Sequence, residues 1–282
     1  MATRLFAAPS PHIHGGEKTR RIMLDVILAL VPALAVSTYV MGWRVLLITG
    51  VAVAGCVVFE YLISRFLLKR GSTIGDLSAI VTGVLLAFNL PVGIPWWIVL
   101  IGALIAIGVG KMTFGGLGCN PFNPALTGRI FLLIAYPVQM TSFPTPSVEG
   151  FTDAYSGATM LGAAKGHLVD FASFDVAGMF TGAIGGSFGE VSALALLLGF
   201  AYLLMRRVIT WHIPVAVLGT MAVFATIFAG VRMEEPAMHL LFPLFHILSG
   251  GALLGAIFMA TDYVTSPMTT KGMVIYGIGI GA

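Results

Sequence analysis

Charged side chains are scarce in this 282-residue sequence: Asp, Glu, Lys and Arg together make up 10% of it, against roughly 25% in soluble proteins. Apolar residues reach 58%, and the mean hydropathy is +0.98. This composition excludes a soluble globular protein and predicts an all-α polytopic membrane protein. We therefore interpret the net charge of +3 as a topology signal. The expected surroundings are membrane lipid, and no nucleic-acid partner is predicted.

Cysteine is almost absent as well. Cys56 and Cys119 lie in or beside apolar runs, and neither has a second cysteine at metal-ligand spacing. We expect two buried thiols, with neither a disulfide nor a self-contained iron–sulfur site. No pair of histidines stands at metal-binding spacing beside a suitable third ligand, so no metal site is predicted.

A removable signal peptide is not apparent at the N-terminus. Residues 1–21 contain Pro, His and charged side chains but no apolar core followed by a cleavage site. The first membrane helix then has to act as the targeting signal. We interpret residues 1–21 as a cytoplasmic tail.

Nine apolar runs follow the tail, and most approach the ~20 residues that cross a bilayer core. The last run has only about ten residues and no closing charge, so we expect either a chain truncated at its C-terminal end or a half-helix there. The runs are 22–41, 45–68, 77–94, 96–110, 124–140, 191–205, 211–231, 239–261 and a run from 273.

Basic residues are concentrated in alternate loops, which predicts the orientation of the chain. The positive-inside rule puts the N-terminus in the cytoplasm and the polar interval Pro137–Asp175 outside. Arg129 is left within a span, where a lone charge is expensive, so we expect it to be functional or paired. The loops predicted to be cytoplasmic contain Arg4, Lys18, Arg20, Arg21, Arg65, Lys69, Arg70, Lys111, Arg206, Arg207 and Lys271, whereas the opposite loops contain Arg44, Lys165 and Arg232.

A short internal echo favours a transporter-like architecture. Thr73–Ala79 reads TIGDLSA, and Ser187–Ala193 reads SFGEVSA. The first copy opens a helix from the cytoplasmic side and the second from outside, as an inverted repeat of about 5+5 transmembrane helices requires. Two independent, well-capped helix N-termini are the alternative.

This architecture predicts a single membrane domain over residues 1–282. Its first helical half covers 22–140, an external interval covers 141–190, and an incomplete second half covers 191–282. The glycine-rich segment Ala177–Ser187 is too short to span and could be re-entrant.

The stretch from Phe114 to Ala125, FGGLGCNPFNPA, is the first candidate site. Gly115 and Gly116 allow unusual backbone angles and the close approach of a ligand. Asn120 and Asn123 can both donate and accept, which suits an uncharged heterocycle with alternating carbonyl and N–H groups. The alternative is a structural turn whose asparagines satisfy broken backbone hydrogen bonds. The later stretch Met259–Gly272 has the same polar character and a Pro break.

The second candidate is Ser156-Gly157-Ala158-Thr159 in the external interval. The hydroxyl of Thr159 is flanked by small residues, as an enzyme needs if it is to thread the segment and attach a phosphoester. An ordinary Gly-Ala turn that caps a short helix at 160–168 is the alternative interpretation.

Taken together, these motifs resemble the RnfD subunit of Rnf electron-transport complexes and its relative, the NqrB subunit of the sodium-pumping NADH:quinone oxidoreductase. The resemblance covers essentially the whole chain. It is carried by Ser10–Gly15, Phe114–Arg129, Tyr155–Leu161, Gly189–Ser192 and Ala260–Asp262.

The resemblance implies a flavoprotein subunit of an ion-translocating ferredoxin:NAD oxidoreductase in a bacterial or archaeal plasma membrane. It implies FMN bound covalently to Thr159 through a phosphoester made by a flavin transferase, with Ser156, Gly157 and Ala158 in the recognition motif. It also implies riboflavin near Asn120, Asn123, Gly115 and Gly116. The implied partners are the A, B, C, E and G subunits of an Rnf complex.

Flavins suit a membrane conduit because they exchange one or two electrons. No glycine-rich run here follows a strand and opens a helix, so no NAD site is predicted in this chain. A flavin-free channel or secondary transporter for a small polar solute is the alternative function, since an inverted repeat and interrupted helices fit it as well. The sequence assigns no ion-path role to Asp25, Glu60, Asp76, Glu190 or Asp262.

Overall fold

The protein is described by a computed structural model that defines residues 19–69, 73–144, 156–157, 178, 180, 187–232 and 236–282. These residues are mostly helical. Their only strand pairing joins β1 to β2, two residues each and antiparallel. In order, the elements of the first half are α1 (Thr19–Met41), α2 (Arg44–Leu62), η1 (Ile63–Leu67), η2 (Ile74–Asp76), α3 (Ser78–Phe88), α4 (Trp96–Gly108), η3 (Met112–Phe114), α5 (Pro124–Ala135) and α6 (Pro137–Thr141).

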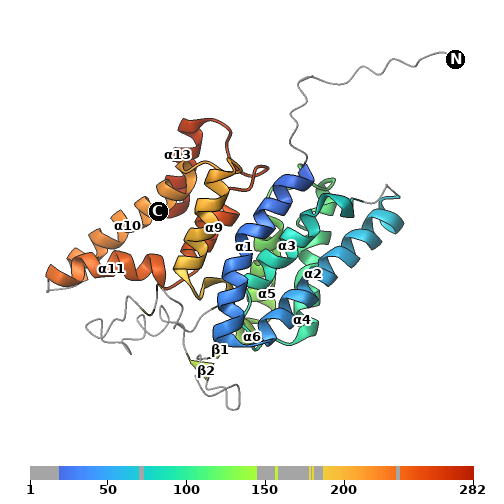
Figure 1. Cartoon of the computed structure of the whole chain (residues 1–282), viewed down its shortest axis with the longest axis horizontal. Helices are drawn as coiled ribbons and strands as arrows, with labels where there is room; N and C mark the ends of the chain where they lie inside the picture. Colours follow the sequence, from blue (N-terminus) through green and yellow to red (C-terminus); the bar gives the residue numbers. More distant parts are fainter. Residues whose placement is uncertain are drawn as a thin grey trace.

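The second half is separated from the first by the strand pair. Figure 1 shows α1 to α6 as one bundle, in blue to green, with α9 to α13 beside it in yellow to red; the most extensive contact between the two groups is that of α1 with α9. The remaining elements are β1 (Phe143–Pro144), β2 (Ser156–Gly157), η5 (Phe188–Glu190), α9 (Ala193–Met205), α10 (His212–Arg232), α11 (Pro236–Leu248), α12 (Ala252–Leu254), η6 (Gly255–Met259) and α13 (Thr270–Gly281).

Within the described part of the chain, three helical stretches are long and apolar enough to cross a membrane: Thr19–Met41, Arg44–Leu67 and Trp96–Phe114. A fourth, Leu241–Leu248 with Ala252–Met259, is bent by 69° at its break. Helices of this length and composition support a multi-pass membrane protein. All nine predicted runs contain helix, although several boundaries differ.

The predicted third span, 77–94, is wrong in length. Helix α3 ends at Phe88 after 11 residues, about 16 Å at 1.5 Å per residue, which is too short to cross a bilayer core alone. Two prolines, Pro91 and Pro95, follow within seven residues, and a proline disfavours helix at the residue before it. The chain therefore turns inside the bundle, beside η5.

The predicted fifth and eighth spans are interrupted too. Tyr136, with φ −132° and ψ 58°, separates α5 from α6 immediately before Pro137. Ser249, Gly250 and Gly251 separate α11 from α12. Interrupted helices inside a membrane bundle persist where the freed backbone lies against protein or lines a cavity.

The echo between 73–79 and 187–193 is also present in the local structure. In each copy a three-residue 3-10 turn, η2 or η5, precedes a helix, α3 or α9. Asp76 Oδ1 accepts a hydrogen bond from the backbone N of Ser78 at 2.8 Å, and Ser192 Oγ accepts one from Ala195 N at 3.3 Å. The acids of the two copies, Asp76 and Glu190, each lie in the 3-10 turn. An inverted repeat of the whole halves remains a prediction.

Glycines allow the shortest helix contacts in the core. A Cβ on Gly83 of α3 would lie 2.6 Å from Val53 Cα of α2. A Cβ on Gly189 of η5 would clash with Phe88 at the end of α3, whose ring packs edge-on against Phe188 with centroids 5.8 Å apart. These contacts fix the end of α3 against η5.

The cysteine prediction is half right. Cys56 of α2 is buried and free, as expected. Cys119 is exposed, which contradicts the predicted burial. It lies in the irregular turn that follows Gly118, where the chain has left the apolar helix.

Candidate functional site

A cavity of about 390 Å³ lies where the two helical groups meet. Its lining comes from the start of α1, the start of α3, the turn before α5, the end of α9 and the segment after η6. The volume falls within the ~300–1,000 Å³ of small-molecule sites. The cavity therefore unites the glycine-rich motif with the Met259–Gly272 stretch, which are far apart in the sequence.

Three glycines shape the turn that leads into this cavity. Gly115, Gly116 and Gly118 have φ angles of 115°, 102° and 91°, which a residue with a Cβ adopts only under strain. Gly118 lines the cavity. Gly115 and Gly116, predicted as ligand contacts, form the turn that carries the next residues toward the cavity.

Asn123 lines the cavity and caps helix α5. Its Oδ1 accepts hydrogen bonds from Ala125 N at 3.0 Å and Leu126 N at 3.4 Å, as an N-cap side chain does. The cap engages Oδ1, so Nδ2 is the polar atom with which Asn123 can donate to a ligand. Asn123 therefore caps α5 and also lies on the cavity wall, where its Nδ2 can contact a ligand.

Asn120 also lines the cavity and joins its two motifs. Its Nδ2 donates to the carbonyl O of Phe122 at 3.0 Å and to Asp262 Oδ2 at 3.4 Å. Asp262 lies just beyond η6, and burial raises the pKa of its carboxyl, opposed by hydrogen bonds from Val264 N and Asn120. In the sequence, Asp262 belonged to a motif of the family resemblance, and no ligand role was predicted for it. The polar character of Met259–Gly272 was the feature of the sequence that could have indicated its contact with Asn120 at the cavity.

The rest of the cavity wall is largely apolar. An apolar wall with a few convergent polar groups is typical of sites for flat organic ligands. The apolar side chains come from α1, α3, α9 and η6, and they include Val26, Val81, Leu85, Leu203, Ile257 and Phe258.

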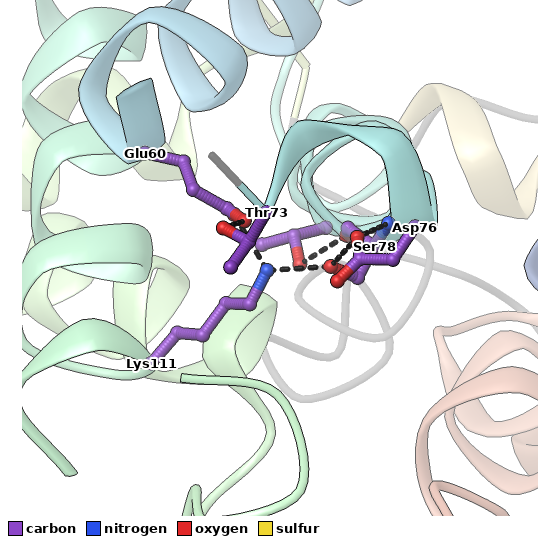
Figure 2. A network of polar contacts seen from close by, with 6 residues as sticks. Glu60, Thr73, Asp76, Ser78 and Lys111 are labelled. Atoms are coloured by element: carbon purple, nitrogen blue, oxygen red, sulfur yellow. Dashed lines mark hydrogen bonds and ion pairs between the residues drawn. The ribbon is translucent and has the colours of Figure 1, made fainter. Parts of the chain in front are cut away.

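Lys111 and Ser78 supply a further polar edge, which Figure 2 shows from close by. Lys111 Nζ lies 2.5 Å from Glu60 Oε2 of α2 and donates to Ser78 Oγ at 2.6 Å. Thr73 Oγ1 donates to Glu60 Oε1 at 2.6 Å, and Ser78 Oγ donates to Asp76 Oδ1 at 2.5 Å. A buried ammonium group thus borders the cavity. In the sequence, Lys111 served only as a topology signal.

Arg129 lies away from the cavity, near the end of α3. Its Nη1 donates to the neutral amide Oδ1 of Asn89 at 2.9 Å, so Arg129 has a hydrogen-bond partner within the bundle. A Cβ built on Gly251, at the break between α11 and α12, would lie 3.1 Å from Glu190 Cδ and 3.8 Å from Arg129 Nη1. Arg129 and Glu190 therefore lie where the end of α3, the turn η5 and the break between α11 and α12 come together.

Half of the predicted FMN motif lies outside the described residues. Ser156 and Gly157 form β2, and they pair with Pro144 and Phe143 of β1; Ala158 and Thr159 are not described. Figure 1 shows β2 beyond the end of α1 that is opposite Thr19, a residue that lines the cavity. The structure thus separates Ser156 and Gly157 from Asn120 and Asn123.

Comparison with known proteins gives matches over nearly the whole chain. The model of the "NQR2, RnfD, RnfE family" matches residues 6–282. The D subunit of the Na⁺-translocating ferredoxin:NAD⁺ oxidoreductase complex of Acetobacterium woodii is 45% identical over 280 residues, covering 98% of this chain and 83% of the relative. The proton-translocating counterpart of Clostridium ljungdahlii is 41% identical over 282 residues, with coverages of 97% and 83%. The D subunit of the ion-translocating oxidoreductase complex of Stutzerimonas stutzeri is 40% identical over 294 residues, with coverages of 93% and 80%.

Proposed function

Because the chain belongs to the NQR2, RnfD and RnfE family, and its relatives are named as subunits of ion-translocating oxidoreductase complexes, we propose that it is the flavin-carrying membrane subunit of an Rnf complex. In this role it passes electrons within a complex that oxidises ferredoxin and reduces NAD, coupled to Na⁺ or H⁺ transport. One relative is named as Na⁺-translocating and another as proton-translocating, so the names are compatible with either ion.

The observation that carries this proposal is the cavity beside Asn120 and Asn123. Its volume of about 390 Å³ and its apolar wall suit a tricyclic heterocycle such as that of riboflavin. The heterocycle's carbonyl and ring N–H groups match the amide groups of asparagine, which donate and accept. A bound flavin supplies the ability to exchange one or two electrons.

The residues of the chain have separate tasks in this proposal. The hydrogen bonds by which Asn123 caps α5 fix its side chain so that Nδ2 can donate to a ligand carbonyl. The hydrogen bond to Asp262 orients the amide of Asn120. Gly118 lets the backbone approach closely. Val81, Leu85 and Phe258 cover the faces of the ligand and exclude water.

Covalent FMN at Thr159 is the second part of the proposal. The strand β2 holds Ser156 and Gly157, the first half of the recognition motif, at the end of the bundle away from the cavity. The charge bias of the loops favours an extracytoplasmic side for this end. A flavin transferase acting on that side would form the phosphoester with the Thr159 hydroxyl.

We propose a plasma membrane location, an inverted repeat of the two helical halves, and partners among the A, B, C, E and G subunits of the complex. The exposed apolar side chains of α10, among them Val223, Ile227 and Phe228, suit contact with lipid or with a partner helix.

The experiment that tests the covalent flavin is a denaturing gel viewed under ultraviolet light. The chain is expressed in a host that contains the transferase, and the wild type should give a fluorescent band that survives denaturation. Thr159→Ala should abolish the band, while the matched control Thr152→Ala should keep it. A dark wild-type band would rule out covalent attachment and favour a flavin-free transporter.

A further inference from the structure

The cation at the cavity edge is Lys111, and its side chain is held from two sides. Glu60 and Ser78 accept from its Nζ at 2.5 Å and 2.6 Å, and the exposed fractions of the Lys111 and Glu60 side chains are 2% and 0%. Figure 2 shows Thr73 fixing Glu60 and Asp76 fixing Ser78 behind these contacts. A lysine anchored in this way has little freedom to move away from the cavity.

An ammonium group has three N–H donors. Two of those on Lys111 point to Glu60 and Ser78, and the side chain itself lines the cavity. We propose that Lys111 is a positioning residue for the redox ligand. Its third N–H donates to an acceptor atom at the polar edge of the heterocycle, and its charge favours the reduced, electron-rich form. This inference rests on the proposed function, since it takes a flavin to occupy the cavity.

The charges of the network explain why a buried lysine can do this. Glu60 offsets the charge of Lys111 inside the apolar bundle when the ligand is neutral. Ser78 links the same ammonium group to Asp76, which is only partly buried. Electrons would arrive from a reduced iron–sulfur or flavin carrier of a partner subunit. Lys111 forms no covalent bond with the ligand.

The test measures riboflavin binding by the purified complex, stripped of free flavin, in equilibrium dialysis under air and again with dithionite. The readout is the ratio of the dissociation constants of oxidised and reduced riboflavin. In the double variant Glu60→Gln/Lys111→Met, which leaves no buried unpaired charge, we expect this preference for the reduced form to fall about tenfold. For a two-electron couple that corresponds to about 30 mV.

Two further variants separate electrostatics from folding. Glu60→Gln alone retains the Lys111 donor and removes its neutralising charge, so the preference for the reduced form should rise. The pair Asp25–Arg206, 3.1 Å apart between α1 and α9, does not line the cavity, so Asp25→Asn/Arg206→Gln should leave the ratio unchanged.

Three results would overturn the inference, and they differ in what else they affect. A ratio in Glu60→Gln/Lys111→Met within twofold of wild type removes Lys111 from the site while the flavin proposal stands. Equal decreases of the preference for reduced riboflavin in Glu60→Gln and in the double variant would mean that the Glu60–Lys111 pair only supports the structure. A wild-type complex that takes up no riboflavin would defeat the cavity part of the proposed function and this inference together.

Discussion

Lys111 Nζ lies 2.5 Å from Glu60 Oε2, and both side chains are almost completely buried. The pair joins the end of the α4 segment to α2 at the edge of the cavity. Removing one member of a buried pair leaves an uncompensated charge, whereas removing both often has little effect on stability. Single and double substitutions of this pair should therefore differ in their effect.

We expect Glu60→Ala to lower the free energy of unfolding by about 3–5 kcal/mol, because it leaves the Lys111 ammonium group buried without its partner. The charge-free double variant Glu60→Gln/Lys111→Met should lose much less. Thermal unfolding in detergent measures both. Equal losses in the two variants would contradict a desolvated ion pair.

The close approach of α3 to α2 gives the second prediction. Gly83→Ala places a methyl group 2.6 Å from Val53 Cα, a backbone atom that cannot move aside, so we expect a loss of about 1–3 kcal/mol. Gly50 of α2 is the matched control because a Cβ there meets nothing within 4 Å; Gly50→Ala should be neutral or slightly stabilising. The melting temperature of Gly83→Ala should lie below that of wild type, and that of Gly50→Ala should equal it or lie slightly above it.

Asp262 gives a prediction about pH. Burial raises the pKa of this carboxyl in the folded state, so its contribution to stability is fully present below its unfolded pKa of about 3.9 and is lost as pH rises through the folded pKa. Asp262→Asn removes the titratable carboxyl and with it this loss of stability at higher pH. The variant should therefore be more stable than wild type at pH 7.5, with the difference shrinking toward acid pH. Melting curves at several pH values measure this, and a variant less stable than wild type at pH 7.5 would be the opposite of the expectation.

Asn123 combines a cap with a cavity contact, and two substitutions separate them. Asn123→Ala loses the cap and should destabilise the chain by about 1 kcal/mol. Asn123→Ser can still cap α5 but lacks the Nδ2 donor. Both should weaken riboflavin binding, and only the first should lower the melting temperature. Normal riboflavin binding in Asn123→Ser would exclude Nδ2 as a ligand contact.

The sequence was sufficient for the class of fold and for the turns with strong local chemistry. Long apolar runs and scarce charge predicted the helices, and the run from residue 124 predicted the start of α5, where Asn123 caps the helix. The breaks were harder to place, because Phe88 to Ile94 is as apolar as a helix and only Pro91, Pro95 and packing against η5 end α3 early.

The composition of the cavity could not be predicted from the sequence. Asn120 and Asp262 are 142 residues apart, and their contact depends on how α12 and η6 return to the bundle. Lys111 looked like a flanking charge, because a lysine after an apolar run is usually a topology signal. Its burial beside Glu60 is a property of the tertiary packing of α2 against α4.

The central claim is that one chain carries riboflavin in the cavity and FMN on Thr159. The direct measurement is to precipitate the purified complex with acid, identify the released flavin by chromatography, and measure the flavin that stays on this polypeptide. We predict riboflavin in the supernatant and FMN on the polypeptide, with Asn123→Ser reducing only the former and Thr159→Ala only the latter. Loss of both flavins in either variant, or a wild-type supernatant without riboflavin, would contradict the claim.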